Sequence, residues 1–175
     1  RLPSTTIVLT WTGSSSVCIG LWRSSVDDVQ ELYRQVILDH NRNPRNFGEL
    51  GEATRVISAV NPLCGDKLTL YVKLDDGTVS DITFKGSGCA ISVASSSLMT
   101  ERVKGTKVED ALRLFDQVHD LLTGAHEHEH SQDLDKLAAL GGVREFPSRV
   151  KCASLAWHAL KSALAENTHT SVTTE

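Results

Sequence analysis

Residues 67–84 read KLTLYVKLDDGTVSDITF, a stretch in which apolar and polar side chains alternate on both sides of an Asp-Gly pair. Alternation with a period of two is typical of a strand that buries one face, and an Asp-Gly pair between such runs indicates a tight hairpin turn. The stretch therefore predicts two antiparallel strands, at 67–74 and 79–84. A third strand is expected at 55–60, which would complete a meander.

Helical patterns lie on both sides of this predicted sheet along the chain. Apolar residues recur at three- and four-residue steps from residue 26 to residue 37, and this helix is expected to end before the Asn43-Pro44 pair. Further helices are predicted at 90–103, from a capping box at Thr106 and Glu109 to Gly124, at 134–140 and at 149–165. This order indicates an α+β fold, a three-stranded antiparallel meander packed against about five helices.

The length and composition predict one small domain. The 175 residues include 40% apolar side chains, which is enough for a single core. We expect this domain to cover residues 26–166 and to be followed by a polar tail at 167–175. Residues 1–25 are rich in Ser and Thr and contain no acidic residue, which predicts a disordered or non-native extension. A transit peptide and a wrongly assigned start are the alternatives for this segment.

Charge and hydropathy argue against two classes of partner. The net charge is −4 and the basic residues are scattered, so nothing favours binding to nucleic acid. The apolar runs are shorter than the roughly 20 residues that a membrane-spanning helix needs. Four cysteines at low density, without an apolar secretory core, favour a reducing cytoplasm, where cysteines are more often catalytic or metal-binding than disulfide-bonded.

Three of the four cysteines are predicted at the ends of helices and strands. Cys64 and Asp66 flank a glycine before a strand, Cys89 precedes a helix, and Cys152 begins the last helix. Loops at one end of the sheet would bring these side chains together, and thiolates and carboxylates are zinc ligands. The start of a helix also favours a thiolate at Cys89. Because no C-x-x-C pair is present, spacing alone leaves open both a zinc site and buried structural cysteines; Cys18 is expected to be a free thiol.

Four blocks of the sequence resemble the SufU family of sulfur-transfer proteins. They read ELYRQVILDHNRNPRN at 31–46, NPLCGD at 61–66, GSGCAIS at 86–92 and RVKCASLAW at 149–157. The chain is similar to the related IscU scaffolds as well. However, it carries Lys151 where IscU proteins have a His, it lacks their Leu-Pro-Pro-Val-Lys stretch, and its segment between Cys89 and Cys152 is long. These differences favour SufU and a SufE/NifU-like fold.

The resemblance implies a zinc-dependent sulfurtransferase. Zinc (Zn²⁺) would be held by Cys64, Asp66, Cys89 and Cys152. Sulfur would arrive as a persulfide from a SufS-type cysteine desulfurase, a pyridoxal-phosphate enzyme, and would pass to a SufBCD-type scaffold for iron–sulfur cluster assembly. The resemblance further implies that a desulfurase His replaces Cys64 at the zinc, so that Cys64 becomes the sulfur carrier. Arg149 matches a family arginine that would steady the Cys64 sulfur by its charge, or it is a solvated residue at a helix start.

Two other functions and a second metal candidate stay open. The same cysteines would suit an IscU-like scaffold that assembles [2Fe–2S] clusters, and they would also suit a non-catalytic adaptor whose zinc only stabilises the fold. His126, His128 and His130 alternate with glutamates, a pattern that binds metal or forms a solvated connector. Asp66, an oxygen ligand among sulfurs, is expected to tune how easily the zinc site opens.

Overall fold

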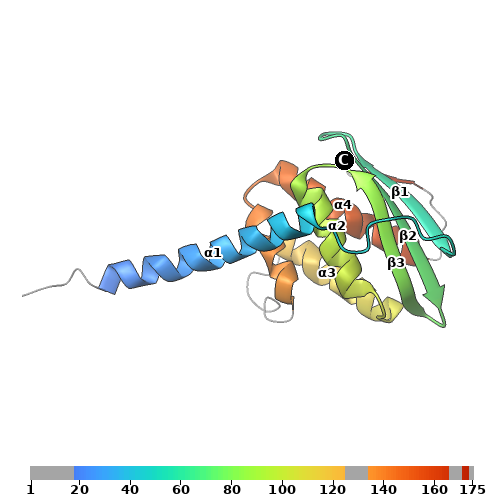
Figure 1. The fold of residues 1–175 in the computed structure, drawn as a ribbon, viewed down its shortest axis with the longest axis horizontal. Helices are drawn as coiled ribbons and strands as arrows, with labels where there is room; N and C mark the ends of the chain where they lie inside the picture. Colours follow the sequence, from blue (N-terminus) through green and yellow to red (C-terminus); the bar gives the residue numbers. More distant parts are fainter. Residues whose placement is uncertain (1–17, 125–133, 166–170, 174–175) are drawn as a thin grey trace, which may run out of the picture.

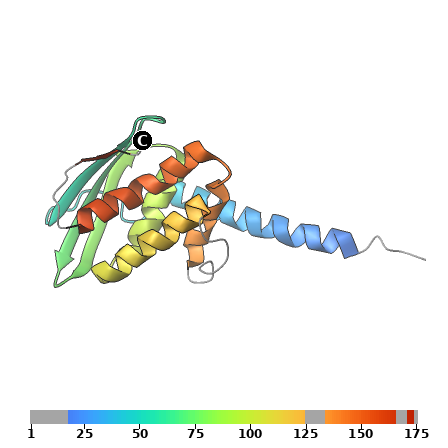
Figure 2. The ribbon, with the colours of Figure 1, turned by 180° about the vertical axis from the view of Figure 1, so that it is seen from behind.

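The computed structural model describes residues 18–124, 134–165 and 171–173, in which a four-stranded sheet has five helices on one side, two of them packed directly against it (Figure 1, and from behind in Figure 2). In chain order the elements are α1 (Cys18–Arg42), β1 (Arg55–Asn61), β2 (Asp66–Asp75), β3 (Thr78–Ser87), α2 (Ala90–Val103), α3 (Val108–Thr123), the 3-10 helix η1 (Asp135–Val143), α4 (Pro147–Leu164) and β4 (Ser171–Thr173). The predicted α+β architecture is confirmed.

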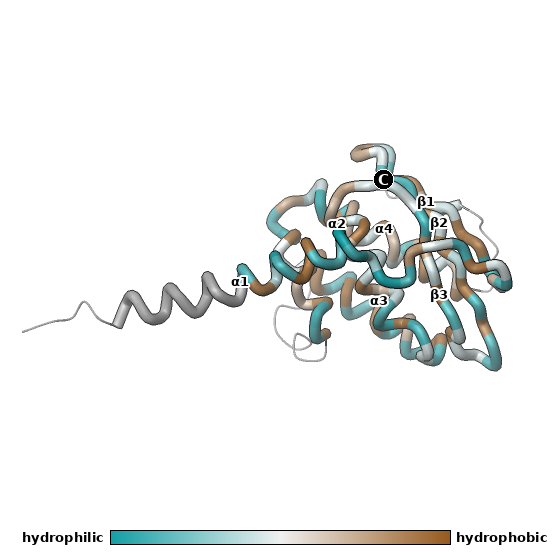
Figure 3. Tube along the Cα trace, in the orientation of Figure 1, coloured by the Kyte–Doolittle hydropathy of each residue, from teal (hydrophilic) through white to brown (hydrophobic). Residues whose placement is uncertain are grey.

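The predicted meander forms the centre of the sheet. Strand β1 pairs antiparallel with β2, from Arg55 opposite Val72 to Asn61 opposite Asp66, and β2 pairs antiparallel with β3. Between β2 and β3 the Asp-Gly pair has two positive φ angles, 46° and 71°, as a tight hairpin turn requires. Figure 3 shows the alternation along these strands as short hydrophobic stretches separated by hydrophilic ones.

The sheet has one strand more than the sequence predicts. Strand β4 pairs in parallel with the edge of β1, with Thr173 opposite Val60. Part of the segment that the sequence assigns to a polar tail is therefore ordered as a strand. The three residues of β4 are too few to show an alternating pattern, and their pairing depends on an edge that the distant β1 provides.

Helix α1 begins at Cys18, which is earlier than the predicted start at residue 26. Capping preferences at the predicted start are worth only about 1 kcal/mol, so they do not prevent a helix from continuing through them. The end at Arg42, before the Asn43-Pro44 pair, agrees with the prediction. The first turns of α1 extend away from the rest of the molecule, whereas its last turns pack against α2 and η1 (Figure 1).

The other helices follow the predictions with small differences: η1 is a 3-10 helix that runs to Val143, α4 begins two residues early at Pro147, and one cap differs. Helix α2 has the predicted bounds, and α3 ends at Gly124 in the left-handed conformation (φ 74°). The predicted capping box at Thr106 does not form, because the Thr106 hydroxyl donates instead to the carbonyl of Val103, 2.7 Å away at the end of α2. The N-cap of α3 is Lys107. Helix α4 starts with Pro147 in its first turn, where proline is favoured.

Small polar residues allow α2 and α4 to pack closely at the centre of the molecule. Trp157 of α4 is fully buried and donates its indole N–H to the hydroxyl of Ser95, 3.1 Å away. Ser95 in turn donates to the carbonyl of Ala153, at 2.6 Å. Every buried polar atom in this contact thus has a partner, and α4 is fixed over the sheet.

His40 fixes the end of α1 against α2. Its ring is 2% exposed, and Nδ1 lies 2.8 Å from the hydroxyl of Ser97, which also accepts the backbone N–H of Arg45. The Glu101 carboxylate, which can only accept, lies 3.6 Å from Nε2, so the proton of a neutral His40 is best placed on Nε2 and Nδ1 then accepts the Ser97 O–H. None of the helices in the described ranges is long and apolar enough to cross a bilayer.

Candidate metal centre

The loop between β1 and β2 places Cys64 at an exposed tip. Asn61 and Asp66 form the last pair of the two strands, and the N–H of Gly65 donates to the carbonyl of Asn61 at 2.9 Å. Gly65 closes this turn with φ 74°, a conformation that glycine adopts without strain. The Cys64 thiol is therefore exposed, while Asp66, two residues later, already belongs to a buried strand.

Asp66 is a buried carboxylate at the start of β2. Only 2% of the residue is exposed, and its Oδ1 accepts the backbone N–H of Cys89 at 2.9 Å. Burial raises the pKa of Asp66, but interactions with the Cys64 thiol, the Cys89 amide and the neighbouring thiols outweigh burial, so the pKa lies below its usual value. Within the described ranges the second oxygen, Oδ2, is buried and has no hydrogen-bond partner.

Gly88 brings the loop after β3 close to Asp66. A Cβ atom at this position would lie 2.9 Å from the Asp66 carboxyl carbon, closer than side chains normally approach. The absence of a side chain allows the Cys89 amide to reach Oδ1. This close approach is the physical reason for a glycine at this position.

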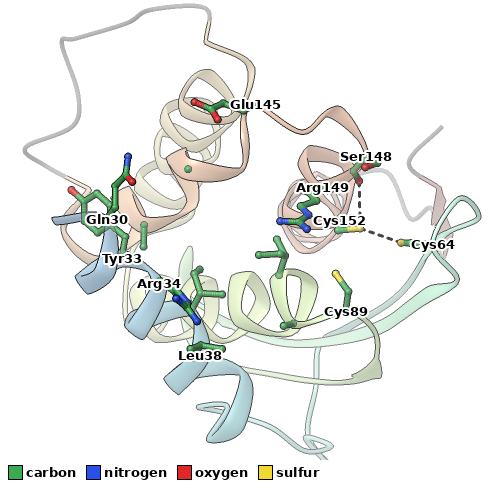
Figure 4. A pocket seen from close by; sticks show the side chains of 15 residues that line it. Gln30, Tyr33, Arg34, Leu38, Cys64, Cys89, Glu145, Ser148, Arg149 and Cys152 are labelled. Carbon is green, nitrogen blue, oxygen red and sulfur yellow. Dashed lines mark hydrogen bonds between the residues drawn. The ribbon is translucent and has the colours of Figure 1, made fainter. Parts of the chain in front are cut away.

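Cys152 comes to the same place from α4. It is 4% exposed, and its Sγ lies 3.2 Å from the Cys64 Sγ and 3.5 Å from the carbonyl of Ser148. Burial is the main reason why the pKa of the Cys152 thiol is raised, and contacts with Cys64 and Asp66 raise it further. Figure 4 shows the sulfur of this buried residue next to that of the exposed Cys64, joined by a dashed line.

Cys64, Asp66 and Cys152 form the group of possible metal ligands found in the described part of the chain. Their ligand atoms all lie within 4.8 Å of one another. Cys89 is outside this group, although it lines the same cavity as Cys64 and Cys152 (Figure 4). The structure thus brings together three of the four predicted ligands and places the fourth beside them. The His126, His128 and His130 tract lies outside the described residues.

The chemistry of this group fits zinc. Sulfur and carboxylate oxygen are zinc donors, and structural zinc sites are usually tetrahedral. A buried carboxylate oxygen without a partner is costly, and a cation at this position would satisfy Asp66 Oδ2. Three thiolates and one carboxylate would complete the coordination if Cys89 turned toward the group.

An open cavity of about 730 Å³ lies next to the metal ligands. Its walls come from α1, with Tyr33 and Ile37, and from the starts of α2 and α4. Arg149 lines the cavity together with Cys64 (Figure 4), and its guanidinium carbon lies 4.8 Å from the centre of the Phe146 ring. The cavity gives Cys64 an accessible surrounding with many apolar side chains, and its charged lining residues are Arg34, Glu145 and Arg149.

Asn61, for which the sequence predicts no role, lies within the site. Its side chain accepts the N–H of Leu63 and donates to the sulfur of Cys152. The residue type alone could have indicated this role, because Asn favours turns in which its side chain accepts a backbone N–H two residues later.

Known proteins resemble this chain over most of its length. The family model of the NifU-like N-terminal domain matches residues 32–153. The zinc-dependent sulfurtransferase SufU of Bacillus subtilis is 45% identical over 139 residues, which cover 79% of this chain and 93% of that protein. The iron–sulfur cluster assembly scaffold protein IscU of Streptococcus pyogenes is 40% identical over 140 residues, with coverages of 80% and 87%.

A solved structure shows the same fold. It comes from Fervidobacterium islandicum and is described as an iron–sulfur cluster assembly scaffold for the SUF system. Its TM-score is 0.70 at 32% identity, and the match covers 74% of this chain and 94% of that one.

Proposed function

Because this chain belongs to the family of the NifU-like N-terminal domain, which also contains SufU and IscU proteins, we propose that it is a zinc-dependent sulfurtransferase of iron–sulfur cluster assembly. It would accept persulfide sulfur from a SufS-type cysteine desulfurase and relay it to a SufBCD-type scaffold. The observation that carries this proposal is the exposed thiol of Cys64, whose sulfur lies at hydrogen-bond distance from the buried sulfur of Cys152. Such thiols stay reduced in a cytoplasm, where we expect the protein to act.

Cys64, Asp66, Cys89 and Cys152 would hold the zinc. The partnerless Oδ2 of Asp66 and the closeness of the Cys64 and Cys152 sulfurs support this assignment. When bound, zinc would keep the thiols ionised at neutral pH. Asp66 and Cys152 are buried on regular elements, so they are the fixed ligands. Cys64 is the ligand on a loop tip, and it is the one that can leave.

Cys64 would act as the nucleophile for sulfur. Its thiolate would attack the outer sulfur of the desulfurase persulfide, and the sulfur–sulfur bond of that persulfide would break. The desulfurase cysteine would leave as a thiolate, and Cys64 would retain the transferred sulfur as its own persulfide. Arg149, in the wall of the same cavity, would stabilise the anionic sulfur by its charge.

Mass spectrometry tests this assignment directly. After incubation with a SufS-type desulfurase and free cysteine, we expect one additional sulfur atom on Cys64 and a faster desulfurase. Cys64→Ala should abolish both effects and leave the fold intact, whereas Cys18→Ala, outside the site, should change neither. A chain that gains no sulfur on Cys64 and leaves the desulfurase rate unchanged would exclude the proposal.

The scaffold is the second candidate, because an IscU protein is nearly as similar in sequence as SufU. Anaerobic reconstitution with iron and sulfide would then give the visible absorption of a [2Fe–2S] cluster, and Cys89→Ser would remove it. Lys151, beside Cys152 on α4, argues against this candidate because IscU proteins have a His there. If the protein were an adaptor with a purely structural zinc, Cys64→Ala would instead unfold it.

A further inference from the structure

Asn61 makes three hydrogen bonds that connect separate parts of the metal centre. Asn61 is fully buried. Oδ1 accepts the N–H of Leu63 at 3.1 Å, and Nδ2 donates to the Sγ of Cys152 at 3.7 Å. Its backbone carbonyl accepts the N–H of Gly65 at 2.9 Å. One side chain therefore contacts both the loop that carries Cys64 and the buried sulfur on α4.

The two ends of the Asn61 amide have different effects. The bond from Leu63 N–H to Oδ1 fixes the first half of the loop, as in turns that begin with Asn. The bond from Nδ2 to the sulfur draws electron density from the Cys152 thiolate without adding a ligand. Hydrogen bonds to ligating groups orient these ligands and tune the metal.

We propose that Asn61 is a positioning residue of the metal centre, which holds Cys152 as the fixed ligand and orients the loop so that Cys64 meets the same metal ion. Asn61 is not a ligand and takes no part in the sulfur chemistry. This inference rests on the metal site of the proposed function, but not on sulfur transfer.

Two substitutions separate the two ends of the amide. Asn61→Asp keeps the oxygen that accepts the Leu63 N–H and replaces the donor that faces Cys152 with a second oxygen. Asn61→Ala removes both groups. Thr54→Ala is the matched control, because Thr54 precedes the same strand and its hydroxyl accepts the N–H of Leu74 at 3.1 Å, at the far end of β1.

Cobalt(II) bound in place of zinc gives a spectroscopic reading of the Cys152 sulfur. Loss of the N–H donor makes the thiolate more electron-rich, so the thiolate-to-cobalt absorption of Asn61→Asp should shift to longer wavelength, while the ligand-field bands remain those of a four-coordinate ion. Thr54→Ala should leave the wavelength unchanged, even if it lowers the melting temperature. A general loss of stability would not shift the absorption wavelength in Asn61→Asp while leaving it unchanged in Thr54→Ala.

Zinc affinity and amide exchange test the loop. Competition with a chromophoric chelator should show zinc affinity reduced roughly 10–100-fold in Asn61→Ala, the usual effect of removing a group that supports a ligand. The Leu63 amide should exchange roughly 2–10-fold faster in Asn61→Ala and at the wild-type rate in Asn61→Asp. Thr54→Ala should match the wild type in both measurements.

Several results would overturn the inference. An Asn61→Asp protein with four-coordinate ligand-field bands and an unshifted thiolate-to-cobalt band would exclude the contact with sulfur. Wild-type zinc affinity in Asn61→Ala would exclude positioning. All these measurements use the isolated protein without a desulfurase. A protein that shows them but fails to accept sulfur would contradict the proposed function alone.

Discussion

Single residues explain how two distant loops meet at one carboxylate. Asp66 needs to be buried and still receive the amide of Cys89, and this is possible because Gly88 presents no side chain to it. The same contact leaves Oδ2 free for a cation. The site therefore depends on a glycine that binds nothing itself.

Gly88→Ala should disturb the site through this contact. The new methyl group would displace the Asp66 carboxylate or the loop, at a cost of about 1–3 kcal/mol in the free energy of unfolding. Zinc affinity should fall together with stability. Gly51→Ala is the control, since within the described ranges a Cβ atom there meets nothing within 4 Å. Urea unfolding and chelator competition measure the two effects, and equal zinc affinities in the two variants would contradict the role of Gly88.

His40 makes the stability of the fold depend on pH. Burial, and then the charge of Arg45, lower its pKa below the ordinary value of 6.5, despite the opposing charges of Glu101 and Asp39. Between the lowered pKa and 6.5 the unfolded chain binds more protons than the folded one, so stability rises with pH across this window and is lost as pH falls through it.

A substitution isolates this contribution. His40→Gln should lower stability at neutral pH and should flatten the rise in unfolding free energy between acidic and neutral pH. His158, whose pKa is also lowered chiefly by burial, contributes in the same direction and stays in both proteins. Urea unfolding at several pH values gives the comparison. Parallel pH curves for the variant and the wild type would show that His40 is not responsible.

At the level of helices and strands, local sequence explains most of the fold. Alternation and a turn pair predicted β2 and β3, because these strands bury one face against the core, and apolar spacing predicted α1 from residue 26 onward. The start of α3 was predicted within one residue, but the cap differs, because the Thr106 hydroxyl donates to Val103 and does not cap α3. The role of Asn61 was also missed, because its contact with Cys152 joins residues far apart in sequence.

Strand β4 covers the edge of β1, and its removal should have a measurable effect. A chain that ends after Glu166 would expose backbone groups of β1 and part of the surface that Val172 covers. We expect a loss of about 1–3 kcal/mol in unfolding free energy, the scale of one apolar side chain, and association of exposed strand edges at high concentration. Thermal unfolding and light scattering measure these effects. A chain that ends after Thr173 serves as the control, and if it behaved like the shorter chain, β4 would have no such role.

Considered as a whole, the molecule joins three separate segments at the proposed zinc site. Cys64 and Asp66 come from the loop between β1 and β2 and the start of β2. Cys89 comes from the loop before α2, and Cys152 from the start of α4. An ion bound to all three segments stabilises the folded state in proportion to the logarithm of its concentration relative to its dissociation constant.

Removal of the metal should therefore destabilise the whole fold and not just the loops. At a zinc concentration 1,000 times the dissociation constant the stabilisation is about 4 kcal/mol, so chelation should lower the melting temperature by several degrees. Cys152→Ala should lose more of this stabilisation than Cys64→Ala, because Cys152 is the buried ligand. Calorimetry with and without chelator measures the difference, and equal losses would contradict the division between fixed and leaving ligands.

The short hairpin at the site has a consequence for timing. Asn61 and Asp66 remain paired as the last rung of β1 and β2, so the Cys64 thiol can move by reorienting only the four residues between them. Movements of such loops take nanoseconds to microseconds, whereas enzymes commonly turn over about 1–1,000 times per second. Opening of the site is then expected to be fast relative to turnover. The pace of sulfur delivery would be set by collision with the donor and by the chemistry that releases its sulfur.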